Sequence, residues 1–156
     1  MSIETWIDQI AIFCGQIDDG RGSLVRSYHV FDKDEFPAAL TQYPCAIHYT
    51  TGVISTFSDG GPAYDIWKGC TEFHLVANVD KNQFPYIIRY FARIRNAFAL
   101  HRTLGGLVKC LWLDPNEDPN IQGPVTFQYG SEDPHLGLLV KWLVKENVSG
   151  TFTLGS

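Results

Sequence analysis

The sequence lacks the long apolar segment of a membrane or secreted protein. Nowhere in its 156 residues do 18 apolar residues follow one another, and Met1-Ser2-Ile3-Glu4 is not a basic segment leading into an apolar one. Cysteine is scarce: the four residues lie far apart, with no C-x-x-C pair and no neighbouring ligand at zinc spacing. We therefore expect no transmembrane segment, no secretion signal and no zinc site, and reduced cysteines suit a cytoplasmic origin.

Motifs that bind phosphate or activate a nucleophile are also missing. The sequence contains no G-x-x-x-x-G-K-[ST], G-x-G-x-x-G or G-x-S-x-G. Asp114-x-Asn116-x-Asp118 opens like a calcium loop, but Pro119 stands where that loop needs glycine. The net charge of −5 has the wrong sign for a surface that grips phosphate backbones. We expect no metal, no cofactor, no catalytic residue and no sequence-specific nucleic-acid ligand.

What the chain does have is enough apolar material for a core. Hydrophobic residues make up 45% of it, aromatic residues 13% and charged residues 19%. A chain of this length buries about 70% of its unfolded surface on folding. Because no internal repeat or low-complexity tract interrupts it, we predict a single domain spanning residues 1–156.

Two segments have helical periodicity. Near the N-terminus, apolar residues recur at i, i+3, i+4 and i+7 behind Ser2, a residue suited to an N-cap. Residues 82–104 place a second apolar stripe on one third of the circumference, with Pro85 in the first turn and Gly105-Gly106 as the C-cap. We also expect a short helix over residues 34–40.

The remaining segments predict strands. Apolar and β-branched runs bounded by turn residues occur at 24–31, 45–50, 53–58, 66–78, 107–113, 125–129 and 138–144. Runs of strands interrupted by a single long helix are typical of an α+β domain. We predict a mostly antiparallel sheet with one long amphipathic helix and an N-terminal helix packed on it.

Titratable residues gather on two of the predicted strands. Glu72 lies two residues from His74, and therefore on the same sheet face, while His48 lies on another strand. If the two strands pair, these side chains form a candidate metal or acid/base cluster. We favour the alternative of polar residues on the solvent-exposed face of the sheet, because the spacing fixes no third ligand. His29, His101 and His135 have no local partners that define a mechanism.

Charge is distributed unevenly along the chain. Residues 81–110 contain six basic side chains and no acidic one, whereas residues 111–135 contain five acidic side chains and no Lys or Arg. On the long helix, Arg89 and Arg93 lie opposite the apolar stripe, so we expect them to be exposed. One interpretation is a solvated face; the other is a contact between subunits, since a head-to-tail ring needs two complementary surfaces on each protomer.

The chain resembles the tail terminator, or tail-completion, proteins of long-tailed bacteriophages, a family of small α+β proteins that form rings. The residues that carry the resemblance are the start Ile3-Glu4-Thr5-Trp6-Ile7, the segment Tyr43-Pro44-Cys45-Ala46-Ile47-His48-Tyr49, the strand Glu72-Phe73-His74-Leu75-Val76-Ala77-Asn78-Val79 running into the helix, and the block Gly137-Leu138-Leu139-Val140-Lys141-Trp142-Leu143-Val144. The match covers most of the chain as an order of elements, and residues 18–31 align least well.

The resemblance implies a structural virion protein without catalysis. Such a protein forms a hexameric ring, docks on the last ring of the tail tube, ends its polymerisation and joins the tail to the head connector. The expected subunit contact pairs Arg89 and Arg93 of one protomer with Glu117 and Asp118 of the next. Two polar loops are candidate contacts with the tube protein or a neck protein. These loops contain Asp59, Gly60, Gly61, Pro62, Asp114 and Asn116.

Two other classes remain open at this stage. One is a small-molecule-binding or enzymatic α+β cone, whose curved sheet leaves an aromatic pocket with His48, His74 or Glu72 at its mouth. The other is a different phage neck or minor tail protein, which shares the ring but differs in partner.

Overall fold

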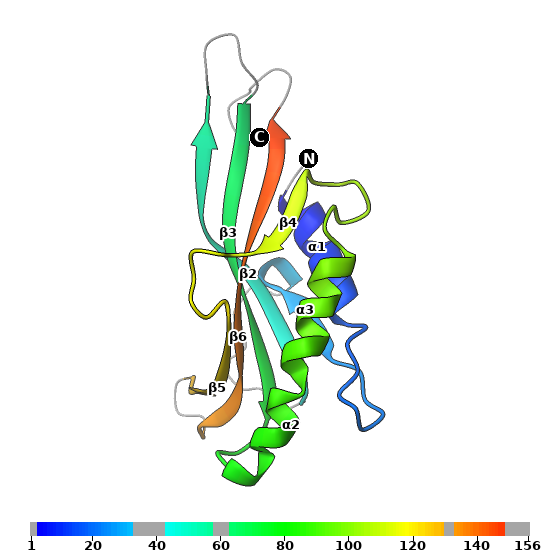
Figure 1. Cartoon of the computed structure of the whole chain (residues 1–156), viewed down its shortest axis with the longest axis vertical. Coiled ribbons are helices and arrows are strands. Elements are labelled where there is room, and N and C mark those ends of the chain that lie inside the picture. The colour runs from blue at the N-terminus through cyan, green and yellow to red at the C-terminus, as the bar shows by residue number, and fades with distance from the viewer. Residues whose placement is uncertain (1–2, 33–42, 58–62, 130–132, 149–156) are drawn as a thin grey trace.

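The computed structural model describes residues 3–32, 43–57, 63–129 and 133–148 (Figure 1). The helices are α1 (Ile3–Cys14), α2 (Phe84–Ile88) and α3 (Tyr90–Leu100), with short 3-10 helices η1 (Val30–Asp32) and η2 (Lys81–Gln83). The strands are β1 (Arg26–His29), β2 (Cys45–Thr56), β3 (Ala63–Val76), β4 (Cys110–Leu113), β5 (Ile121–Phe127) and β6 (His135–Val148). The predicted helix at 34–40, the loop Asp59-Gly60-Gly61-Pro62 and the tail 149–156 lie outside the described residues.

The strands form one mixed sheet in the order β1-β2-β3-β6-β4, and β5 also pairs with β6. Only β1 and β2 run parallel; the other pairs of this sheet are antiparallel. The α+β fold with a mostly antiparallel sheet is therefore confirmed, as is the N-terminal helix.

The helices lie on one face of the sheet (Figure 1), which we call the helical face. There α1 packs against β1 and β2, while α3 lies beside β4 and α2 beside β5. The centre of this layer is aromatic: Trp6 of α1 and Trp142 of β6 are fully buried and meet edge to face, with ring centroids 6.0 Å apart. The amphipathic pattern of α1 is thus satisfied by large side chains from the longest strands.

A glycine in β3 makes room for the central tryptophan. Gly69 pairs with Trp142 across the sheet, and a Cβ at Gly69 would lie within 2.5 Å of three ring carbons of that indole. The ring therefore lies over the backbone of β3, which only glycine permits at this position.

Some strand boundaries differ from the predicted ones. The segments 45–50 and 53–58 belong to a single strand, because a register shift between Thr50 and Gly52 absorbs the break that the glycine suggested. β5 begins at Ile121, four residues before the predicted start, and a register shift between Gln122 and Val125 accommodates the proline between them. β6 extends beyond the predicted 138–144 at both ends.

The long helix is bent and shorter than predicted. It breaks at Arg89 into α2 and α3, and it ends at Leu100 instead of continuing to residue 104. His101 occupies the C-cap with φ −122°, so Gly105-Gly106 are not the cap. With Leu104 they adopt positive φ in the turns before β4, which delays that strand from the predicted residue 107 to Cys110.

Candidate functional site

Titratable side chains gather on the sheet face opposite the helices. Glu72 and His74 of β3 meet His135 at the start of β6: His74 Nδ1 lies 2.7 Å from His135 Nε2, and His74 Nε2 lies 3.2 Å from Glu72 Oε1. Tyr49 of β2 donates its hydroxyl to Glu72 Oε2 over 2.5 Å, and Tyr129 donates to Glu72 Oε1. We call these five residues the Glu72 cluster.

Glu72, His74 and His135 of the Glu72 cluster are buried, which corrects the prediction that Glu72 and His74 lie on a solvent-exposed face. His74 and His135 are fully buried and Glu72 is 8% exposed. The rings of Phe127 and Tyr129 lie 4.6 and 5.6 Å from that of His74, so aromatic side chains from β5 and the residues after it take the place of solvent. Alternation in β3 therefore separates two buried faces and does not distinguish an inside from an outside.

Strand register explains which predicted residues meet. β2 and β3 do pair, but His48 stands opposite Thr71 and therefore points to the helical face, away from Glu72 and His74. The alternative in which His48 joins these two residues is therefore not realised, and the favoured prediction of an exposed His48 is wrong, because its side chain is fully buried. His135 takes its place because β6 pairs with β3 from the other side, with Gly137 opposite His74. Local spacing holds no signal for that pairing, which joins residues 61 positions apart.

Burial and the neighbouring carboxylate keep the hydroxyl of Tyr49 protonated. Burial, followed by the hydrogen bond to Glu72 and the charge of that carboxylate, raises the pKa of Tyr49 well above its ordinary value. Tyr49 therefore acts as a donor to the carboxylate, and its hydroxyl holds the carboxylate in place. The cluster thus connects a carboxylate, two imidazoles and two phenols through short polar contacts.

His48 has a separate environment on the helical face. Its Nδ1 lies 2.7 Å from Thr71 Oγ1 and its Nε2 lies 2.6 Å from Ser27 Oγ, while Trp142 Nε1 donates to Thr71 Oγ1 over 2.9 Å. Burial, and after it the charge of His29, lowers the pKa of His48 to about 3. A base of that pKa is poorly matched to proton abstraction near neutral pH, so the contacts of His48 support a structural role between β1, β2 and β3.

Cysteine chemistry and metal binding gain no support from the geometry. The four cysteines form no disulfide bonds; Cys14, Cys45 and Cys70 are buried, and burial raises the pKa of Cys14 and of Cys70. Within the ranges that the structure describes, no three His, Cys, Asp or Glu side chains are grouped to hold a metal ion. In the same ranges no helix is long and apolar enough to cross a membrane.

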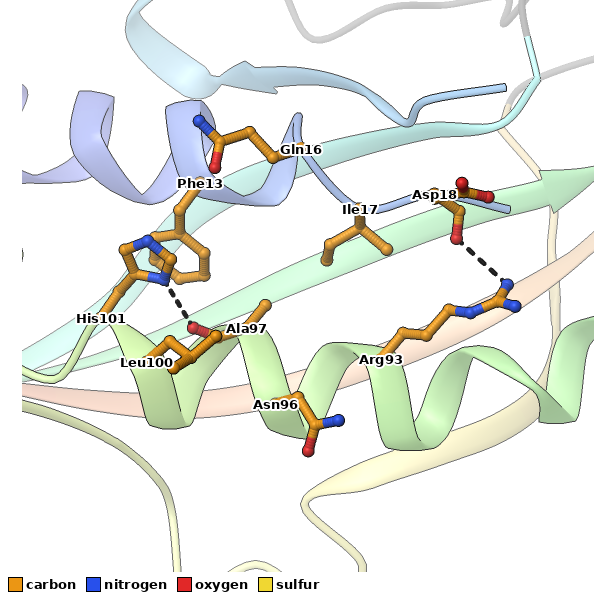
Figure 2. Close-up of a pocket in the computed structure, with 9 residues that line it drawn as sticks. All are labelled: Phe13, Gln16, Ile17, Asp18, Arg93, Asn96, Ala97, Leu100 and His101. Atoms are coloured by element: carbon orange, nitrogen blue, oxygen red, sulfur yellow. Dashed lines mark hydrogen bonds between the residues drawn. The ribbon is translucent and has the colours of Figure 1, made fainter. Parts of the chain in front are cut away.

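A groove of about 330 Å³ lies between the C-terminal parts of α1 and α3 (Figure 2). Phe13, Ile17 and Ala97 give it apolar walls. At one end the ring of His101 stacks on Phe13, with centroids 4.7 Å apart, and its Nδ1 donates to the carbonyl of Ala97 over 2.8 Å. At the other end stands the guanidinium of Arg93, which donates to the carbonyl of Asp18 over 3.1 Å.

The two arginines predicted to contact a neighbouring subunit differ in their surroundings. Arg89, at the bend between α2 and α3, is exposed, and no carboxylate in the described part of the chain pairs with it. Arg93 is half-buried, since the turn that follows α1 folds over it; a Cβ on Gly20 would lie 2.6 Å from its Nη2. The expectation of an exposed side chain therefore holds for Arg89 and fails for Arg93.

The acidic residues predicted to contact a partner lie in the turn between β4 and β5. Asp118 and Asn116 are exposed, whereas Glu117 is half-buried, 3.9 Å from Lys141 Nζ. Asp114 is only 3% exposed, and its carboxylate accepts from the amide of Asn116 over 2.9 Å. Its side chain thus shapes the turn from inside. The other predicted partner loop, Asp59 to Pro62, lies outside the described residues.

Comparison with known proteins returned no match: no protein-family model fits the chain, and no curated protein is significantly similar to it.

Proposed function

We propose that the chain is a ring-forming structural subunit of a long-tailed phage, a tail terminator that caps the tail tube and joins it to the head connector. In this role the protein acts in the virion, with a tube subunit and a connector or neck protein as partners. The observation that carries the proposal is the outer part of β2, a long sheet edge suited to pairing with another chain.

This edge extends beyond the helical layer. Figure 1 shows β2, β3 and β6 continuing past α1 and α3 as a long arm. β1 pairs with β2 only from Cys45 to His48, and beyond His48 no strand in the described ranges pairs with the outer side of β2. Two adjacent apolar side chains on this segment are exposed, Val53 by 44% and Ile54 by 53%. Because neighbours in a strand point to opposite faces, both faces of the arm present apolar surface.

The edge also lacks the residues that usually protect one. Natural edge strands carry lysine, proline or inward-pointing charge, which prevent pairing with other chains. From Tyr49 to Thr56, the part of β2 beyond its pairing with β1, the sequence contains no Lys, Arg, Asp, Glu or Pro. An exposed, uncharged edge of this length favours assembly by strand addition, in which backbone hydrogen bonds supply affinity.

Native mass and imaging test the proposal. We expect light scattering on the purified protein to give six times the monomer mass in a concentration-dependent way, and negative staining to show annular particles. Ile54→Lys should abolish the large species, because it places a charge on the pairing edge. Val79→Lys is the matched control, since Val79 is equally exposed, at 53%, but lies outside the sheet.

The outcomes separate the candidate roles. A monomer at all concentrations contradicts the proposal. A ring that both lysine variants affect equally contradicts the outer edge of β2 as the basis of assembly. Co-purification with a tail-tube subunit favours a terminator, whereas co-purification with a portal or adaptor favours another neck component.

A further inference from the structure

Two features that match in chemistry lie on opposite sides of the molecule. The groove between α1 and α3 lies on the helical face, whereas the turn between β4 and β5, which we call the acidic turn (residues 114–120), lies on the other side of the sheet (Figure 1). The ion pair of Glu117 with Lys141 agrees with this placement, because Lys141 precedes Trp142 and points away from the helices. The groove and the turn of one chain therefore cannot meet.

The groove contains an arginine that makes no ion pair within the described ranges. Asp18 also lines the groove, but its carboxylate accepts from the amide of Gly20. Arg93 is half-buried at its end, and within the described ranges its guanidinium has no carboxylate within ion-pair distance; its hydrogen bond goes to the Asp18 carbonyl (Figure 2). A carbonyl satisfies one donor of the five that a guanidinium carries. Residues 81–110 add further basic side chains and no acidic one. The groove thus favours an occupant that combines a carboxylate with a small apolar group.

The acidic turn has that combination in a fixed shape. The backbone carbonyl of Asp114 accepts from the amide of Glu117 over 3.2 Å and from Asn120 Nδ2 over 3.0 Å, and its side chain accepts from Asn116. Held in this way, the turn leaves Asp118 and Pro119 exposed side by side. A turn that is already ordered loses little conformational entropy when it binds.

We propose that the groove is the receiving half of a head-to-tail contact between copies, occupied by the acidic turn of the neighbouring copy. The Asp118 carboxylate binds Arg93, and Pro119 packs on the apolar side chains of Ala97 and Leu100, of which Leu100 is 80% exposed. Each copy then presents one acidic turn and one groove, so the same contact repeats from copy to copy. The copies form a closed ring when the rotation between neighbours allows it. This inference rests on the proposed ring, and it names one of its contacts.

Cysteine cross-linking between two singly substituted chains tests the contact directly. Asn96→Cys lies on the groove and Asn116→Cys on the turn, both at exposed positions, and both leave Arg93 and Asp118 in place. Mixed under mild oxidation, the two variants should form a disulfide-linked pair of chains. Asn96→Cys mixed with Val79→Cys, an exposed position outside both features, should not. Equal cross-linking in both mixtures would show random collision and overturn the contact.

Charge exchange gives a second readout. Asp118→Lys should raise the concentration needed for assembly about tenfold, because like charges then face each other. Arg93→Asp in the same chain should restore assembly, whereas Glu4→Lys, the same charge change at an exposed residue of α1, should have no effect. If rings form with no cross-link between groove and turn, and Asp118→Lys assembles like the wild type, this contact is overturned while the proposed ring stands. A chain that stays monomeric overturns the ring as well.

Discussion

At the scale of single residues, burial and partners matter more than residue type. Thr71 and Glu72 are neighbours in β3, yet each is buried in a different network: Thr71 links His48 to Trp142 on the helical face, and Glu72 gathers two tyrosines and His74 on the other. The network of Thr71 satisfies polar groups that would otherwise be costly to bury. Such residues make the sheet specific, and the burial of His48 also makes its stability depend on pH.

His48 provides the clearest case of this dependence. Its pKa is about 3 in the fold against 6.5 unperturbed, so the unfolded chain binds a proton between these values and the folded chain does not. The contribution of the neutral imidazole to the free energy of unfolding is fully present above pH 6.5. It falls as the pH decreases, by up to about 1.4 kcal/mol per pH unit. Urea unfolding at about pH 7.5 and about pH 5 should show a loss near 2 kcal/mol in the wild type that His48→Gln lacks.

The control for this experiment keeps the imidazole. Ser27→Ala removes one hydrogen-bond partner of His48 but leaves the ring buried, so it should lower stability at both pH values and retain the slope. If His48→Gln and the wild type lose the same stability on acidification, other groups set the pH dependence.

At the scale of elements, periodicity predicted what depends on local sequence. The apolar stripe of α1 and the alternation in β3 identified the right elements, because a helix or strand buries the side chains that its own period aligns. The break in β2 and the end of α3 were misplaced, since a register shift and the positive φ values near Gly105 depend on the pairing around them. The Glu72 cluster was not the favoured prediction: the shared face of Glu72 and His74 was identified, but their burial was not, and His135 reaches them only through the pairing of β6 with β3.

The pairing of β3 with β6 leads to a prediction for Gly69, with Gly52 of β2 as its control. Gly69→Ala should destabilise the fold by about 3 kcal/mol, because the added Cβ displaces the buried Trp142 ring. Gly52→Ala, in the paired strand β2, has nothing within 4 Å of the new Cβ, so it should change stability by less than about 0.5 kcal/mol. Urea unfolding followed by near-UV circular dichroism measures both. Similar losses in the two variants would mean that Trp142 relaxes at little cost.

At the scale of the whole molecule, the two candidate assembly surfaces differ in their physics. The outer edge of β2 is uncharged and would pair through backbone hydrogen bonds and apolar contact. The groove and the acidic turn, on opposite sides of the sheet, would pair through Arg93 and Asp118. A ring built from both surfaces has one contact that salt screens and one that it does not.

Salt should therefore separate the two contacts. The screening length falls from about 10 Å at 0.1 M to about 3 Å at 1 M salt, so wild-type assembly should need a several-fold higher protein concentration at high salt. Asp118→Lys replaces that attraction with a repulsion, which salt also screens, so assembly of this variant should strengthen as salt rises. Ile54→Lys should prevent assembly at both concentrations, because the charged contact alone is worth about 1 kcal/mol. Light scattering across a salt series measures all three chains. Wild-type assembly that ignores salt would assign the ring to the sheet edge alone, since only a backbone and apolar contact is indifferent to screening.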